Sequence, residues 1–356
     1  MTTNQSAEEL VREPPEVTLW LDEFASLLGF ERIAESLPGN FPPSYVYAGF
    51  MIPIFTAFDF GYDLFVIGGE VHIYYLNPYY ALNPFLLLGA VYGARKLRKE
   101  YATAVREMNL EDRAQTHEAD DLVDTVPQKL PWVLFVIGAT VQFLPSVTDP
   151  SGLVFTDYVM NYFVLPFVYT PIVIQFLAVY FSIEFIAPFR LWRSTVGIDF
   201  LDPEGVGGLR PLGELVKTAY YYIGAGLIGY AFVIYAPLID TGWVPNTGVN
   251  VIFTTVWIIS IGTVAFAVLI LHRFMRREKR AELQRLEAEL SAHIDSRYDI
   301  LEYEIQDDRQ EYVQNLQDRI QKVSKTREYP ATFTIWTQIL LSIALPKAFQ
   351  LFISGL

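Results

Sequence analysis

The most constraining feature of the sequence is a long polar run between two apolar segments. From Arg276 to Tyr329 the run contains no Gly and no Pro, so nothing in it breaks a helix. About 50 helical residues at about 1.5 Å each would reach about 75 Å. Both flanking segments, Val249–Leu271 and Ala331–Leu356, are typical of membrane spans, so the run must return to one membrane face. The sequence therefore predicts a helical hairpin that reverses within Asp295–Asp308.

Apolar residues inside this run repeat at every eleventh position in two registers, while a third register, which begins at Leu286, is mostly polar. An eleven-residue period corresponds to about 3.67 residues per turn, which is typical of a nearly straight helical stripe. A narrow stripe favours pairing between helices. We therefore predict that the run anchors subunits to one another on the cytoplasmic side, and the alternative is a solvated charged linker. The predicted anchor residues are Leu283, Ile294, Ile305 and Leu316 in one register, and Leu290, Leu301, Tyr312 and Val323 in the other.

The rest of the chain is strongly apolar. Of all residues, 52% are hydrophobic and 15% are aromatic, which is typical of a polytopic membrane protein. Hydropathy predicts an all-α membrane protein with seven transmembrane helices, of which the second and third are short. The predicted spans are Tyr45–Gly68, Ala81–Ala94, Pro131–Pro145, Val159–Ala187, Thr218–Leu238, Val249–Leu271 and Ala331–Gly355.

Four regions follow from this pattern. Residues 1–43 form a cytoplasmic N-terminal segment, in which Val17–Leu37 is predicted to be an amphipathic helix on the membrane surface. Residues 44–271 form a six-helix transmembrane domain. Residues 272–329 form the cytoplasmic helical anchor, and residues 330–356 form the final transmembrane helix.

The distribution of Lys and Arg predicts the orientation of the chain. If the N-terminus is placed inside and the spans alternate, 25 of the 26 basic residues fall on the cytoplasmic side. The three loops on the outer side, Gly69–Tyr80, Ser146–Tyr158 and Ile239–Gly248, contain none. Because cytoplasmic loops are enriched in basic residues, we expect a multi-pass plasma-membrane protein with its N-terminus inside and its C-terminus outside.

Composition and motifs argue against several classes of function. A net charge of −14 argues against nucleic-acid binding. The absence of cysteine excludes disulfides, thiolate metal sites and cysteine nucleophiles. No convergent set of catalytic groups stands out, so we expect neither an enzyme nor a bound cofactor or metal. The excess of acidic residues, with more Arg than Lys, favours a salt-loving source, and the alternative is an ordinary acidic protein.

Charged residues gather where the first predicted span meets the outer side. Asp59 and Asp63 are four residues apart and share one helical face, and Glu70 and His72 follow them. Charged groups at membrane depth usually face a cavity or a partner. We therefore predict that these four residues line an outer vestibule that attracts cations. The alternative is that the span ends early and the four residues are solvated.

The last predicted span carries polar residues along both of its halves. Pro346 cannot donate a hydrogen bond to the Ser342 carbonyl and would kink the helix between the halves. This pattern predicts a water-filled lining, and the alternative is hydrogen bonding between helices. A lysine in a seventh span also suggests retinal, but the third predicted span has no acidic counter-ion. The predicted pore-lining residues are Thr334, Thr337, Gln338, Leu341, Ser342, Leu345, Lys347 and Gln350, with Leu341 or Leu345 as the constriction.

Two glycine-rich stretches lack the context of a nucleotide site. Gly224-x-Gly226-x-x-Gly229 lies inside an apolar span with no strand before it, so we predict close helix packing through Ala225 and Gly229. Residues 202–213 lack the Gly-Lys-Ser/Thr of a phosphate loop. This second stretch predicts a tight turn that re-enters a helix, and the alternative is a gating hinge.

Taken together, these elements resemble the insect chemoreceptor superfamily of seven-transmembrane ion channels, which includes odorant and gustatory receptors. The resemblance is architectural and covers residues 45–356. Gustatory receptors carry Thr-Tyr, five apolar residues and Gln-Phe in the last span, where this sequence has Thr332-Phe333 and then Gln338-Ile339, one residue early. The resemblance implies a homotetramer in membrane lipid, with a central pore lined by the last span and a small-molecule ligand bound among spans one to six.

From the residues and the resemblance we expect an oligomeric, cation-conducting channel that a ligand opens. The alternative is a membrane receptor or scaffold in which the helices of Arg276–Tyr329 recruit a cytosolic partner.

Overall fold

The computed structural model describes residues 18–65, 78–108, 113, 129–148, 159–235, 247–293 and 310–329, together with four separate positions between 344 and 351. Across these residues all regular secondary structure is helical, which confirms the all-α prediction. Two of the described helices are long and apolar enough to cross a membrane, Tyr162–Arg193 with 32 residues and Phe253–Ser291 with 39 residues. A shorter apolar helix covers Lys129–Thr140.

Helices occupy six of the seven segments that hydropathy selects. The fourth segment is one continuous helix made of η4 (Met160–Tyr169), α11 (Thr170–Phe181), η5 (Ser182–Ile186) and α12 (Ala187–Arg193). The last predicted span lies outside the described residues apart from four positions. The helices of the other five segments are α4 (Pro43–Phe65), α6 (Asn83–Glu107), α9 (Lys129–Thr148), α13 (Arg210–Tyr235) and α14 (Thr247–Ser291).

Prolines explain the irregular backbone of the fourth helix, in which η4 and η5 are π-helical. A proline has no N–H and cannot bond to the carbonyl four residues earlier. Pro171 therefore leaves the Phe167 carbonyl available, and the Tyr47 hydroxyl of α4 donates to it. Pro188 likewise cannot bond to the carbonyl of Glu184, and the preceding turn widens so that the Ala187 N–H reaches the Ser182 carbonyl.

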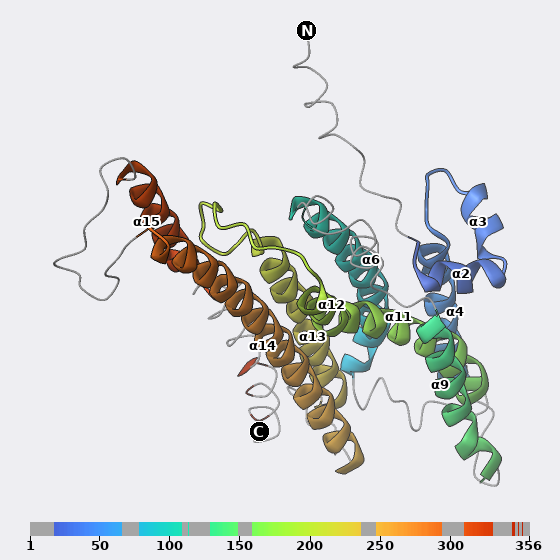
Figure 1. Ribbon diagram of the computed structural model, residues 1–356. Coiled ribbons are helices and arrows are strands. Elements are labelled where there is room, and N and C mark those ends of the chain that lie inside the picture. The colour runs from blue at the N-terminus through green and yellow to red at the C-terminus, as the bar shows by residue number, and fades with distance from the viewer. Residues whose placement is uncertain are drawn as a thin grey trace.

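The N-terminal region differs from the single surface helix that the sequence predicts. It forms two short helices, α2 (Trp20–Leu27) and α3 (Phe30–Ser36), because Gly29 adopts a left-handed conformation with φ of 89° between them. Trp20 and Phe24 are buried against α4 and α9, where Trp20 meets Trp132 edge-on at 5.2 Å. α2 is thus part of the protein core (Figure 1), and the exposed apolar residues of this region are Leu27, Leu28, Ile33 and Leu37.

α6 lies at the centre of the bundle and packs against α4, α11 and α13. α6 and α13 are antiparallel and approach closely at two glycines. A Cβ atom on Gly229 would lie 2.4 Å from Leu86 Cδ2, and one on Gly93 would lie 2.9 Å from Tyr222 Cδ1. The Gly229 contact confirms the predicted use of this residue for close helix packing, but Ala225 is exposed in the single chain, so its predicted role in that packing is wrong there. A Cβ on Gly226 would meet nothing within 4 Å.

Gly229 and Gly226, both on α13, form a matched pair for a test. We expect Gly229→Ala to lower the free energy of unfolding by about 1 kcal/mol, because the added methyl group overpacks the contact with Leu86. Gly226→Ala should have little effect. Thermal unfolding of the purified protein in detergent measures both, and the Gly229→Ala loss should shrink in a Leu86→Ala background. Equal effects of the two alanines would contradict the close approach.

The polar run after the bundle forms a helical hairpin. α14 continues without interruption from its apolar half to Ser291, and α15 (Gln310–Lys325) packs antiparallel along its polar half (Figure 1). The pairs along the hairpin include Glu289 with the Tyr312 hydroxyl near the reversal and Lys279 Nζ with the Thr326 carbonyl at 2.7 Å near its base. The hairpin agrees with the prediction, and the predicted reversal in Asp295–Asp308 falls outside the described residues.

Candidate functional site

The loop between α12 and α13, residues 194–209, is folded around one carboxylate. We call it the Asp202 loop. Asp202 accepts hydrogen bonds from the backbone N–H groups of Glu204 at 3.0 Å, Val206 at 3.0 Å and Gly208 at 2.9 Å. The turn needs left-handed backbone at Gly207 and Gly208, with φ of 71° and 70°. α13 then begins at Arg210, which confirms the predicted tight turn that re-enters a helix.

Arg113 ties this loop to the end of α6. Its guanidinium donates to the carbonyls of Gly197 at 2.6 Å, Gly207 at 3.1 Å and Met108 at 3.1 Å. Burial lowers the pKa of Arg113, and the charges of Asp199 and Asp202 oppose that effect. One side chain thus holds together the residue that follows α6 and two segments of the loop.

The base of the hairpin docks on the same loop. The Arg327 N–H donates to the Gly205 carbonyl at 2.7 Å, and Arg277 Nη1 of α14 donates to the Trp192 carbonyl at 2.9 Å. His272 stacks on Tyr329 with ring centroids 4.3 Å apart, and its Nδ1 lies 2.9 Å from the Glu328 carbonyl oxygen. The residues that precede the predicted last span are therefore fixed to both α14 and the Asp202 loop.

Asp202 gives the loop a pH dependence that can be measured. Burial would raise its pKa, but hydrogen bonds from Gly208, Glu204 and Val206 and the charge of Arg113 outweigh burial and lower it. A lowered folded-state pKa stabilises the loop above the ordinary value of about 3.9, and this contribution is lost as pH falls through the lowered pKa. We expect Asp202→Asn to destabilise the loop by about 1–3 kcal/mol at neutral pH, because acceptor capacity for three N–H groups is reduced.

Hydrogen–deuterium exchange of residues 199–209 as a function of pH measures this effect. Asp199→Asn is the matched control, since Asp199 is exposed and accepts one N–H bond, from Leu201. Unchanged protection in Asp202→Asn would show that the carboxylate does not organise the turn.

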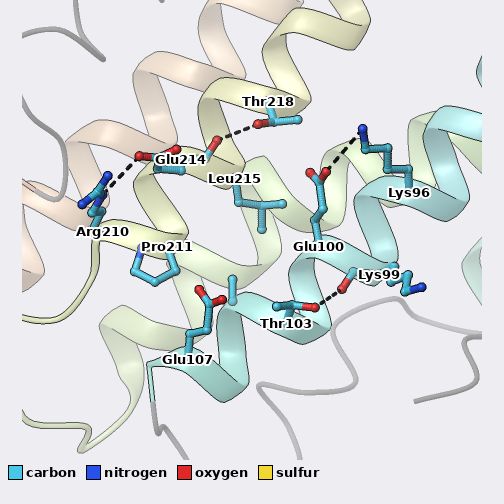
Figure 2. A pocket seen from close by; sticks show the side chains of 11 residues that line it. Lys96, Lys99, Glu100, Thr103, Glu107, Arg210, Pro211, Glu214, Leu215 and Thr218 are labelled. Atoms are coloured by element: carbon cyan, nitrogen blue, oxygen red, sulfur yellow. Dashed lines mark hydrogen bonds and ion pairs between the residues drawn. The ribbon is translucent and has the colours of Figure 1, made fainter. Parts of the chain in front are cut away.

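A groove of about 770 Å³ lies beside this loop, between α6 and α13. Figure 2 shows its charged side chains, with Lys96 reaching Glu100 at 3.8 Å and Arg210 reaching Glu214 at 3.2 Å. Three cations and three carboxylates line it, so the groove has balanced charge and no preference for an anion or a cation. The lining residues are Lys96, Lys99, Glu100, Thr103, Ala104 and Glu107 of α6 and Arg210, Pro211, Glu214, Leu215 and Thr218 of α13.

The predicted vestibule and pore residues lie mostly beyond the part of the chain that the structure describes. Asp59 and Asp63 lie on α4, but their side chains are outside the description. Leu345 is described, and its side chain is exposed in the single chain. The predicted residues that lie outside the described residues are Glu70, His72, Thr334, Thr337, Gln338, Leu341, Ser342, Lys347 and Gln350.

Part of the predicted anchor packs within one chain. Leu316 and Val323 of α15 are buried in a cluster that includes Leu283 and Leu290 of α14. The centre of this cluster on α14 is Leu286, which is 1% exposed and belongs to the register that reads as mostly polar. Tyr312 is exposed, and Ile294, Leu301 and Ile305 lie outside the described residues. A role of these residues between subunits stays a prediction.

One buried charged group inside the bundle was not among the predicted site residues. Glu184 of η5 is 0% exposed and is the only charged residue in the fourth predicted span. A lone carboxylate in an apolar span was a signal available in the sequence, because such residues are costly in a membrane and usually functional.

Comparison with protein families, curated proteins and solved structures finds no match to this chain. The described residues contain no group of three or more metal-ligating side chains.

Proposed function

We propose that this protein is a multi-pass membrane channel that conducts cations as an oligomer, with its last span lining the pore. The observation that carries the proposal is the closure of the hairpin at its base. His272 directly follows the apolar half of α14, and Tyr329 directly precedes the last apolar segment. Because their rings stack at 4.3 Å, the chain returns to the level at which it left the apolar region. This closure supports our proposal that the last span, within residues 330–356, begins at a membrane boundary and re-enters the bilayer.

The distribution of charge supports the same arrangement. Basic residues from three separate segments gather at one end of the bundle, where Arg113 binds the Asp202 loop and Arg277 binds Trp192. Such an end is expected to face the cytoplasm. The outer loops carry only acidic charges, which favours cations over anions at the outer entrance. Seven spans, with the N-terminus inside and the C-terminus outside, satisfy all of these features.

Recording from the purified protein in planar bilayers tests the proposal. We expect cation currents that Gln338→Leu abolishes, because it removes a polar side chain from the proposed lining. Gln321→Leu is the matched control, since Gln321 is an exposed residue of α15. The mass of the detergent-solubilised particle should correspond to a tetramer. A correctly folded oligomer that passes no ions under any condition would overturn the proposal.

A receptor or scaffold is the second candidate, and the hairpin favours it because its outer surface is charged and exposed. Replacing residues 276–329 with a short linker distinguishes the channel from the receptor or scaffold. In a channel the replacement disrupts the oligomer, as measured by particle mass. In a scaffold the oligomer survives and capture of the cytosolic partner is lost.

A further inference from the structure

Glu184 is a carboxyl group buried without a partner. Its side chain is 0% exposed, and neither of its carboxylate oxygens has a hydrogen-bond partner among the described residues. No cation in that part of the chain pairs with it. Buried polar groups are nearly always hydrogen-bonded, and a buried ionised carboxylate without a cation costs several kcal/mol. Packing alone gives no reason for a glutamate at this position.

Among the residues that the structure describes, the surroundings of Glu184 supply hydroxyl groups and no cation. The titratable groups close enough for their charges to interact with it are the phenols of Tyr180 on α11 and Tyr220 on α13. The Tyr220 hydroxyl is buried and also has no partner among the described residues. From α14, Thr263 Oγ1 lies 3.0 Å from the Tyr180 hydroxyl. α12 carries two arginines further along the same helix, Arg190 and Arg193, of which Arg193 is exposed.

The backbone at this position is also irregular. Glu184 lies in the π-helical η5, directly before the turn that Pro188 distorts. π-helical turns inside α-helices occur frequently at functional sites. η5 packs against both α13 and α14, so the carboxyl group lies where three elements of the bundle meet.

We propose that Glu184 is a reversible proton-binding site inside the bundle. When no water lies between these helices the carboxyl group is neutral, because no described neighbour compensates a negative charge. When water enters between α11, α13 and α14, the carboxyl group transfers its proton to that water. The carboxylate that remains can accept a hydrogen bond from the unpartnered Tyr220 hydroxyl. This proposal does not depend on ion conduction, since a transporter, receptor or channel could use the site.

Infrared spectroscopy of the full-length protein in lipid bilayers tests the proposal directly. A neutral carboxylic acid has a carbonyl-stretch band that a carboxylate lacks, and the band shifts when the proton is exchanged for deuterium. We expect a band of this kind at neutral pH that is lost in Glu184→Gln. It should be retained in Glu311→Gln, which makes the same substitution at an exposed residue of α15. Raising the pH should remove the band, and lowering it should restore the band.

Two outcomes would overturn the proposal, and both are measured on the wild-type protein. One is a wild-type protein with no carboxylic-acid band at neutral pH. The other is a band that neither deuterium oxide nor pH ever changes, since that group would not exchange its proton. If Glu184→Gln fails to fold, ¹³C labelling of glutamate in the wild-type protein assigns the band to a glutamate side chain, and a band that does not shift on labelling counts against Glu184.

Discussion

Arg95→Ala should lower the free energy of unfolding by about 3 kcal/mol, because it leaves the Asp22 carboxylate buried without its cation. Arg95 Nη2 lies 2.5 Å from both carboxylate oxygens of Asp22, and the side chains are 19% and 9% exposed. The same carboxylate also accepts hydrogen bonds from the backbone N–H groups of Leu19 at 2.8 Å and Ser44 at 3.2 Å. These two hydrogen bonds remain in Arg95→Ala. The expected loss of stability is therefore at the low end of the range for removing one partner of a buried ion pair.

The neighbouring Lys96 is the control for this experiment. Lys96 is exposed and lies 3.8 Å from Glu100, so Lys96→Ala should change the stability far less than Arg95→Ala does. Adding Asp22→Asn to Arg95→Ala should recover part of the loss, since a neutral amide removes the unpaired charge. Thermal unfolding in detergent measures the stability of these variants. Equal losses for Arg95→Ala and Lys96→Ala would show that the pair with Asp22 does not hold α2 to the bundle.

Leu286→Asp should detach α15 from α14, at a cost of at least about 4 kcal/mol to the hairpin. Leu286 is 1% exposed and packs in one cluster with Leu316 and Val323. Removing a buried leucine side chain costs about 2–5 kcal/mol, and a carboxylate in the same place adds the cost of burying a charge. Phe200 of the Asp202 loop also packs against this cluster, so the effect should be centred on the hairpin and extend to that loop.

Hydrogen–deuterium exchange of the α15 amides measures this loss. Gln284→Asp adds the same carboxylate two residues away at an exposed position of α14, and it should leave α15 protected. Persistent protection of α15 in Leu286→Asp would contradict the packing of the hairpin. If the hairpin holds subunits together, the particle mass should fall in Leu286→Asp alone.

Several features of the fold were predictable because they depend on local chemistry. Apolar runs of sufficient length marked six helical segments, and the absence of Gly and Pro after Arg276 marked the helices of the hairpin. Two apolar segments on either side of the polar run required it to turn back. The glycines of residues 202–213 predicted a turn, since few other residues adopt its left-handed backbone.

Other features depend on which elements meet in space. The eleven-residue pattern did not select Leu286, because burial on α14 is decided by where α15 and Phe200 pack. The predicted surface helix near the N-terminus became two helices because Gly29 breaks it, and α2 joined the core because Asp22 pairs with Arg95 on α6, 73 residues away.

The sequence by itself thus determined where helices form and that the polar run folds back, since backbone propensity and apolar length act over neighbouring residues. Only the tertiary structure decided which charges are compensated. Asp22 and Glu184 are both buried acids, yet Asp22 meets an arginine and two N–H groups, while Glu184 has no hydrogen-bond partner among the described residues. The difference arises from contacts between distant segments, which no local pattern contains.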